Sequence, residues 1–275
     1  MIHLFPKIKK KMLLIAVCYI ALVAVYIALN PGANHLVTLL IAGAGLAVVM
    51  FGQMINAYNA HSALLSRLYN DLNVDGFLKL YEPMLNIPLK NDNVALTVRL
   101  HASNAYCAQG RFDDAIALLK SCKLPSTGKA ENDLLSKFAV VSNLCYCAEQ
   151  KEDVETAKAY MNELLDLKKQ LEAMQTSKPE KKRMVFNTEL NEQCLSFLTT
   201  GKCDVDALQI LVKNNTQMLH KITISLWIAR AYLAENNRRE AEKLLERIVN
   251  LAPTLYPGHM AASILSGLPG KTEEA

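Results

Sequence analysis

The chain has 275 residues, of which 51% are hydrophobic and 20% are charged, and its mean hydropathy is +0.11. This length is enough for one or two domains with sizeable cores. Its 11 glycines and 9 prolines are too few for a collagen-like or low-complexity chain. Residues 1–61 contain four lysines and no acidic residue, so the other 26 basic side chains balance the 26 acidic ones in residues 62–275. A domain that binds duplex nucleic acid needs a surplus of positive charge against the phosphates, so this class of function is excluded.

Two long apolar runs lie near the N-terminus. Met12–Leu29 is uninterrupted over 18 residues, and Leu36–Phe51 is broken only by Thr38 and two glycines. An 18-residue helix is about 27 Å long, which is close to the hydrocarbon thickness of a bilayer. The six residues between the runs include a Pro-Gly turn signature and are too few to cross a bilayer. The sequence therefore predicts two antiparallel helices that form a transmembrane hairpin.

The predicted hairpin covers residues 12–61, contacts lipid through residues 12–52 and follows a basic N-terminus at residues 1–11. Because positively charged flanks stay inside, we expect both chain termini on the cytoplasmic side of the cell membrane. A buried helical pair and a cleaved signal peptide are the alternatives. The first would show a polar face and the second a short apolar core with an A-x-A site, and neither feature is present.

Charged residues and histidine are absent from both apolar runs, which argues against a channel or transporter. Small residues recur at four-residue spacing, as Ala24 and Ala28 and as Gly43 and Ala47. This spacing permits close helix approach, so a homo- or hetero-oligomer formed through the hairpin is a further expectation. Small residues are also simply common in such helices.

Helical spacing continues after the second run through Leu64, Leu68 and Tyr69, so one long helix is expected to end within Asn73–Gly76. A pattern of helix, turn and helix follows. Around residues 100–119 a helix reaches Ala108, Gly110 provides the stop and Asp113 is the expected N-cap of the next helix. The same plan returns near the C-terminus, where an Asn-Asn turn separates two helices and Pro253 ends the second.

These residues resemble the tetratricopeptide repeat (TPR), a helix–turn–helix unit of 34 residues. Two copies fit the family pattern well: Ser103, Tyr106, Gly110, Ala115 and Leu119 in the first, and Ala229, Tyr232, Asn236, Ala241, Leu245 and Pro253 in the second. Weaker copies lie between them. The marker alanines at 115, 157, 207 and 241 are unevenly spaced, and most of the extra length lies near Leu171–Val185, where Ser177–Arg183 is predicted to be a solvated loop.

The resemblance thus predicts an all-α fold, with the hairpin followed by an α-solenoid of degenerate TPR helix pairs. We expect the TPR-like domain to cover residues 62–265 and lie in the cytoplasm. A disordered tail is expected at residues 266–275.

Seven cysteines are present, but they lack the paired C-x-x-C spacing of a zinc site. Cys145 and Cys147 are the closest pair, and Cys107, Cys122, Cys145 and Cys194 fall on apolar helix faces, where thiols act as small hydrophobic groups in a reducing compartment. The six histidines share no ligand or catalytic spacing, and no nucleotide-binding or nucleophile motif occurs. We therefore expect no metal, no cofactor and no enzymatic activity.

In TPR proteins the first helix of each repeat lines a concave groove that holds a peptide or a partner helix. Carried over to this chain, the resemblance aims Asn104, Asn191, Trp227 and Arg230 into that groove. Trp227 is either an aromatic anchor there or a core residue, and the sequence favours neither. At the position where some family members use Lys to bind a terminal carboxylate, this chain has Leu100, Val140, Asn191 and Leu226. That specificity is not expected here.

The sequence therefore predicts a membrane-anchored scaffold or adaptor, typical of a bacterial membrane protein, that presents a cytoplasmic TPR domain to a protein or peptide partner. The alternative is a subunit or regulator of a membrane enzyme or of a secretion or assembly complex, bound partly through its hairpin.

Overall fold

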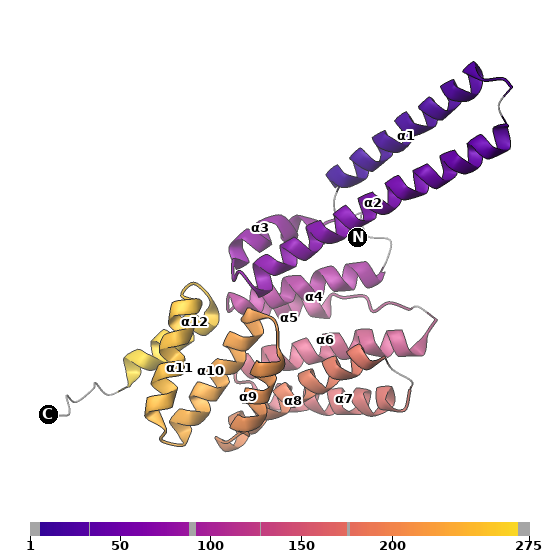
Figure 1. Cartoon of the computed structure of the whole chain (residues 1–275). Helices are drawn as coiled ribbons and strands as arrows, with labels where there is room; N and C mark the ends of the chain where they lie inside the picture. Colours follow the sequence, from indigo (N-terminus) through magenta and orange to yellow (C-terminus); the bar gives the residue numbers. More distant parts are fainter. Residues whose placement is uncertain (1–5, 33, 88–91, 127, 175–176, 269–275) are drawn as a thin grey trace. The chain divides into compact units, whose positions relative to one another are not determined.

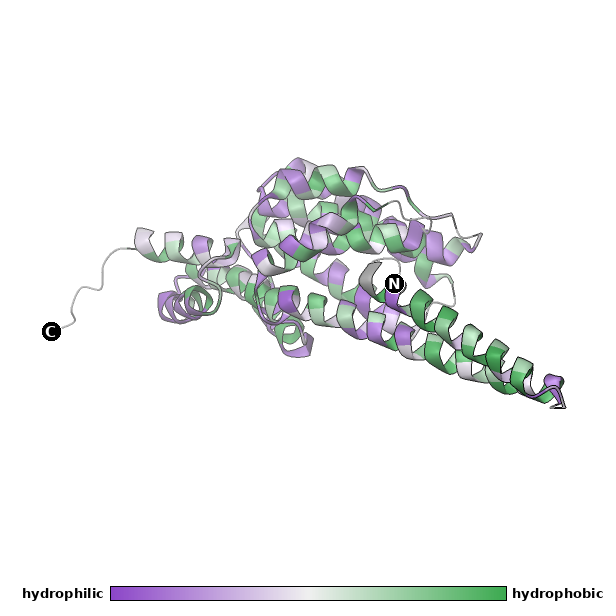
Figure 2. Ribbon diagram, turned by 90° about the horizontal axis from the view of Figure 1, so that it is seen from above, coloured by the Kyte–Doolittle hydropathy of each residue, from purple (hydrophilic) through white to green (hydrophobic). Residues whose placement is uncertain are grey.

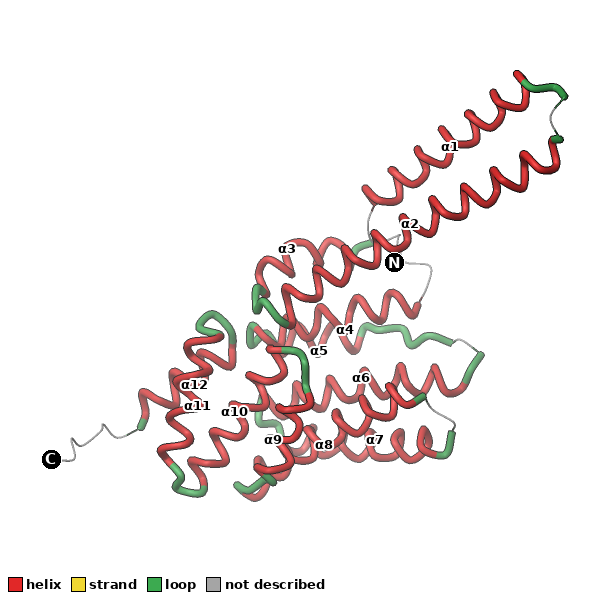
Figure 3. The backbone as a smooth tube through the Cα atoms, in the orientation of Figure 1, coloured by secondary structure: helices red, strands yellow, loops and turns green. Residues whose placement is uncertain are grey.

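The computed structural model describes residues 6–32, 34–87, 92–126, 128–174 and 177–268. Twelve helices occur in these ranges and no strand does (Figure 3). The chain divides into two compact units, residues 1–65 and residues 66–275. The prediction of an all-α protein is confirmed.

The N-terminal unit contains α1 (Pro6–Leu29) and most of α2 (His35–Tyr69). Both helices are long and apolar enough to cross a membrane, and α1 and the first half of α2 are coloured as hydrophobic in Figure 2. A Cβ atom at Gly45 would overlap the Tyr19 phenol, whereas the Cβ position of Gly43 is open. The Tyr19 side chain therefore occupies the space beside Gly45, and the Gly43 spacing noted in the sequence has no such neighbour.

The prediction that α2 continues well beyond its apolar part is confirmed, but its end was predicted a few residues too late. α2 stops at Tyr69, and Leu72 in the following turn has a φ of +57°. Asn73 instead caps the next helix, with its side-chain oxygen accepting a hydrogen bond from the Gly76 amide at 2.9 Å. An Asn at this position satisfies an otherwise unpaired N–H group, so it begins a helix rather than ending one.

Ten helices with short connections form the second unit. Pairs α4/α5, α6/α7, α8/α9 and α10/α11 run antiparallel, α3 precedes them and α12 follows (Figure 1). Their bounds are α3 Val74–Leu85, α4 Asp92–Ala108, α5 Phe112–Lys120, α6 Ala130–Gln150, α7 Val154–Glu172, α8 Lys178–Thr200, α9 Val205–Asn214, α10 Met218–Ala234, α11 Arg238–Leu251 and α12 Tyr256–Gly267.

The turn inside each helix pair contains one residue in the left-handed region. These residues are Gly110, Glu152, Gly201 and Asn236, with φ between +57° and +77°. After each turn a small residue lets the two helices approach. Ala115, Ala157 and Ala241 are fully buried, but Ala207 is half-buried, because in the third pair Leu208 takes the buried position.

The predicted loop at Ser177–Arg183 is wrong, because α8 begins at Lys178. Pro179 lies in the first turn, where a helix N–H group has no partner within the helix, so its missing N–H costs nothing. The negative charge of Glu180 in the same turn interacts favourably with the helix dipole. Residues 181–183 are exposed, so they give no apolar periodicity from which a helix could be predicted.

Two further boundaries also differ from expectation. α5 begins at Phe112, one residue before the predicted cap Asp113, because the Phe112 ring is buried and holds this residue in the helix. α12 extends to Gly267, so the first two residues of the predicted tail are helical, and residues 269–275 lie outside the described residues.

The helical array curves until its last helix contacts its first pair. On α12, the Tyr256 ring meets the Phe112 ring of α5 edge-on, with centroids 4.8 Å apart and an interplanar angle of 90°. Between α4 and α5, Gly110 has a φ of +77°, and a Cβ atom there would lie 2.8 Å from Tyr256 Cδ2. The curvature leaves a cavity on the inner side of the array.

Candidate functional site

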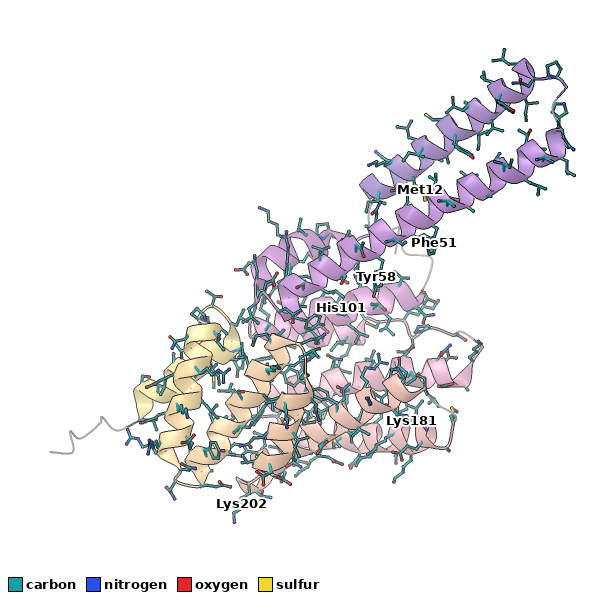
Figure 4. All side chains as sticks on the ribbon, viewed as in Figure 1. Met12, Phe51, Tyr58, His101, Lys181 and Lys202 are labelled. Carbon is teal, nitrogen blue, oxygen red and sulfur yellow. The ribbon has the colours of Figure 1, made fainter. Side chains whose placement is uncertain are left out.

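The cavity of the second unit has a volume of about 1090 Å³. Most of its lining comes from the first helices of the four pairs, α4, α6, α8 and α10, with contributions from α9, from Tyr69 at the end of α2 and from Pro257 on α12. Figure 4 labels two of the lining residues, His101 on α4 and Lys181 on α8. Since first helices line the concave face of a helical-repeat array, the cavity is the groove of this array.

Three carboxamides from successive first helices form the floor of the groove. Asn104 Nδ2 donates to the Tyr69 hydroxyl at 2.9 Å, Asn143 Nδ2 donates to the Ala139 carbonyl at 2.7 Å, and Asn191 Nδ2 approaches Ser142 Oγ at 3.4 Å. Each bond fixes the orientation of its amide. A carboxamide carries two donors and an acceptor oxygen, so it matches the N–H and C=O groups of an extended peptide backbone.

One end of the groove is built from the rings of Tyr69, His101 and His220. The Tyr69 hydroxyl is hydrogen-bonded to His101 Nδ1 at 2.8 Å, and the Tyr69 ring meets the His220 ring edge-on, with centroids 5.5 Å apart. Burial raises the pKa of Tyr69 to about 12 and lowers the pKa of His220 to about 4. The Tyr69 hydroxyl and the His220 ring are therefore neutral near pH 7.

The start of α8 and the helix α9 contribute basic and apolar side chains to the groove. Lys181, Lys182 and Arg183 line the groove and are exposed. Val185 and Ile210 line it too, although 51% and 56% of their surfaces are exposed to solvent. The groove therefore has a polar, amide-rich floor and a basic, apolar rim.

A sequence model of the tetratricopeptide repeat matches residues 225–254, which contain most of α10 and the whole of α11. Residues 225–254 therefore form a tetratricopeptide repeat. The matched residues include Ala229, Tyr232 and Ala241 of the second strong copy. No curated protein and no solved structure matches the chain.

Only two of the four residues that the TPR resemblance aims into the groove line the cavity. Asn104 and Asn191 line the cavity, whereas Trp227 and Arg230 do not. Trp227 is 2% exposed and packs in a core cluster with Cys194, Leu208 and Ile224. Of the two alternatives for this residue, its placement is that of a core residue.

Arg230 covers the edge of this core. Its guanidinium carbon lies 4.5 Å from the centroid of the Trp227 ring and 5.1 Å from that of Phe197, and Nη2 donates to Glu152 Oε1 at 2.7 Å. The charge therefore lies between two aromatic rings and a carboxylate of the α6–α7 turn. This arrangement joins the second and fourth helix pairs of the array.

Other groove residues escaped the sequence analysis. Asn143 lies on α6, between Asn104 on α4 and Asn191 on α8, and the recurrence of amides in successive first helices was a signal for it. Lys181 and Lys182 were noted only as part of a predicted loop. Tyr69 gave no signal, since it lies on a helix outside the repeats and joins the groove through tertiary contacts.

Buried thiols lie on α4 and α6, and one of them, Cys107, lines the groove. Cys107 Sγ on α4 lies 3.3 Å from Cys147 Sγ on α6, and this contact together with burial raises the pKa of Cys107. Cys145 Sγ donates to Glu149 Oε1 at 3.4 Å, and burial raises the pKa of both groups. A neutral thiol is a weak nucleophile and a poor metal ligand. Among the described residues, no group of three or more His, Cys, Asp or Glu side chains could hold a metal ion.

Proposed function

We propose that this TPR protein is a membrane-anchored adaptor that holds an extended segment of a partner protein in the groove of its helical array. The observation that carries the proposal is the row of oriented carboxamides, Asn104, Asn143 and Asn191, across three successive first helices. At about 1090 Å³ the groove exceeds the usual range of small-molecule sites, about 300–1,000 Å³, and has room for several peptide residues.

The membrane part of the proposal rests on α1 and α2. Their apolar side chains are exposed over most of residues 12–52, which is expected for helices whose solvent is lipid. Four lysines precede the first apolar run, and the turn between the runs has no basic residue. The positive-inside rule then gives a hairpin with both ends in the cytoplasm. In this topology the groove faces cytoplasmic partners.

Site-specific photo-crosslinking in intact bacteria expressing the full chain tests the proposal. A benzophenone amino acid replaces Ile210, which lines the groove and is 56% exposed. The matched control carries it at Leu251, which is 41% exposed on α11 and does not line the groove. We expect discrete protein adducts from position 210 that are absent from position 251.

A second change assigns these adducts to the groove. Asn191→Leu keeps the size of the side chain but removes the carboxamide, and we expect it to reduce the adducts from position 210. Adducts of equal yield from both positions, or adducts that Asn191→Leu leaves unchanged, would contradict a groove-held partner. Extraction of the membranes with alkaline carbonate tests the anchor, since a protein with two spans stays in the membrane pellet.

A further inference from the structure

The longest first helix of the four pairs is α8. Of the first helices of the four pairs, α4 and α10 have 17 residues each, α6 has 21 and α8 has 23. The added turns bring residues 181–183 to the groove. An insertion in a helical repeat that reaches the binding face changes what that face can recognise.

These turns give the groove its charge. Arg183 is paired with Glu180, with Nη2 and Oε2 2.5 Å apart. Lys181 and Lys182 are exposed and make no ion pair with any described residue. Glu189 is the single acidic side chain among the described residues that line the groove. The rim is therefore positively charged, although residues 62–275 as a whole are neutral.

Apolar side chains lie beside this charge. Val185 follows the basic residues on α8, and Ile210 faces the groove from α9. Both are more than half exposed, which is unusual for large aliphatic side chains next to a cavity in this unit. Burying them against an apolar side chain of a ligand would remove water from both surfaces, which is favourable.

We infer that Lys181, Lys182, Val185 and Ile210, together called the α8 rim, select an acidic segment of a protein that also carries an apolar side chain. The inference rests on the proposed function and names the chemistry of its partner. In an extended segment, successive side chains point to opposite sides. The backbone can then bind the carboxamide floor while acidic and apolar side chains reach the rim. Opposite charge at the rim also accelerates encounter, and this effect falls with salt.

Selection from a library of random 12-residue peptides on the full-length protein in detergent micelles tests the inference. Competing peptides are identified by their protection of the benzophenone site at position 210. We expect the groove-bound peptides to be enriched in Asp and Glu near apolar residues. A fluorescein-labelled selected peptide should bind at least about tenfold more weakly to Lys181→Glu/Lys182→Glu, with a salt dependence smaller than that of the wild type.

The matched control is Lys243→Glu/Arg247→Glu, which makes the same change in net charge at two exposed positions of α11 away from the groove. It should bind the peptide as the wild type does, and both variants should keep the wild-type melting temperature. Groove-bound peptides without acidic enrichment, or equal binding by the two double variants, would overturn the inference and leave the proposed function standing. Failure to select any peptide that protects position 210 would overturn both.

Discussion

The Tyr256 ring on α12 stands edge-on to the Phe112 ring on α5, with their centroids 4.8 Å apart. Three helix pairs separate these residues in the sequence. Their contact therefore joins the last helix of the array to its first helix pair. Edge-to-face pairs at this distance contribute about 0.5–1.5 kcal/mol beyond the area they bury. Pro257, the next residue, lines the groove, so the contact also helps to form the groove wall.

Gly110→Ala should weaken the contact between α12 and the first helix pair. The change has two costs, because Gly110 has a φ of +77° and because a Cβ atom there would lie 2.8 Å from Tyr256 Cδ2. Gly201→Ala is the matched control, since Gly201 has a φ of +71° but nothing within 4 Å of its Cβ position. We expect a loss of about 1 kcal/mol from Gly201→Ala and at least about 1 kcal/mol more from Gly110→Ala, measured by urea unfolding. Equal losses in the free energy of unfolding would show that the Tyr256 ring does not lie against this turn.

Trp227→Ala should destabilise the protein strongly. The Trp227 side chain is buried between α8, α9 and α10, and removing a large buried aromatic side chain costs about 3–5 kcal/mol. Arg230→Ala removes a partly exposed charge over the same ring, and its cost should be about 1 kcal/mol or less. Thermal melts followed by circular dichroism compare the two variants. A Trp227→Ala variant with an unchanged melting temperature would return this residue to the list of candidate groove residues.

Local patterns in the sequence predicted the helices and turns but not all the contacts between them. The turn at Gly110 was predicted because a helix stop favours glycine, and the marker alanines were predicted from their match to the repeat pattern. The start of α8 was missed because its exposed Lys and Arg side chains carry no apolar period. Asn104 and Asn191 were predicted to lie in the groove from their register within a repeat. Trp227 remained undecided at the sequence level, because burial of a side chain depends on neighbours from two other helices.

Ala241→Trp tests the register of the repeats. Ala241 is fully buried where α10 and α11 approach, so a large side chain there has no space. Overpacking typically costs about 1–3 kcal/mol, and a change as large as Ala to Trp should cost at least this much. Ala207→Trp is the control, since Ala207 holds the same marker position in the third pair but is half-buried. We expect a smaller loss of melting temperature from Ala207→Trp, and the reverse order would contradict the assigned register.

Glu149 should make the stability of the protein fall as the pH rises. Burial raises the pKa of Glu149 well above its usual value, so the folded protein keeps this proton above about pH 4.3, where the unfolded chain releases it. Its contribution to stability is complete below about pH 4.3 and is lost as the pH rises towards the folded pKa. The limiting slope for one proton is about 1.4 kcal/mol per pH unit.

The difference between wild type and Glu149→Gln isolates this effect. The lowered pKa of His220, about 4, acts in the opposite direction, because its contribution is lost as the pH falls from about 6.5 to about 4. Glu149→Gln should therefore gain stability relative to wild type as the pH rises from 5 to 8, measured as the free energy of unfolding in urea. Glu192→Gln, at an exposed position of α8, should follow the wild type. A parallel pH profile for Glu149→Gln would mean that Glu149 is ionised in the folded protein.

The proposed membrane topology predicts which positions an impermeant maleimide reaches in intact cells. Gly32 lies in the exposed turn between α1 and α2, and nothing lies within 4 Å of its Cβ position, so Gly32→Cys adds a thiol without a clash. Ser177 is exposed before α8, and its side chain makes no capping hydrogen bond. Each thiol is compared with the parent chain, whose Cys107, Cys145, Cys147 and Cys194 are buried. We expect labelling at position 32 in intact cells and at position 177 only after the cells are permeabilised.

A second experiment tests whether the N-terminal lysines determine this topology. Replacing them with glutamine should weaken the labelling preference, since the positive-inside rule depends on positive charge. Labelling at position 177 but not at position 32 in intact cells would reverse the topology and place the groove on the outer side of the membrane.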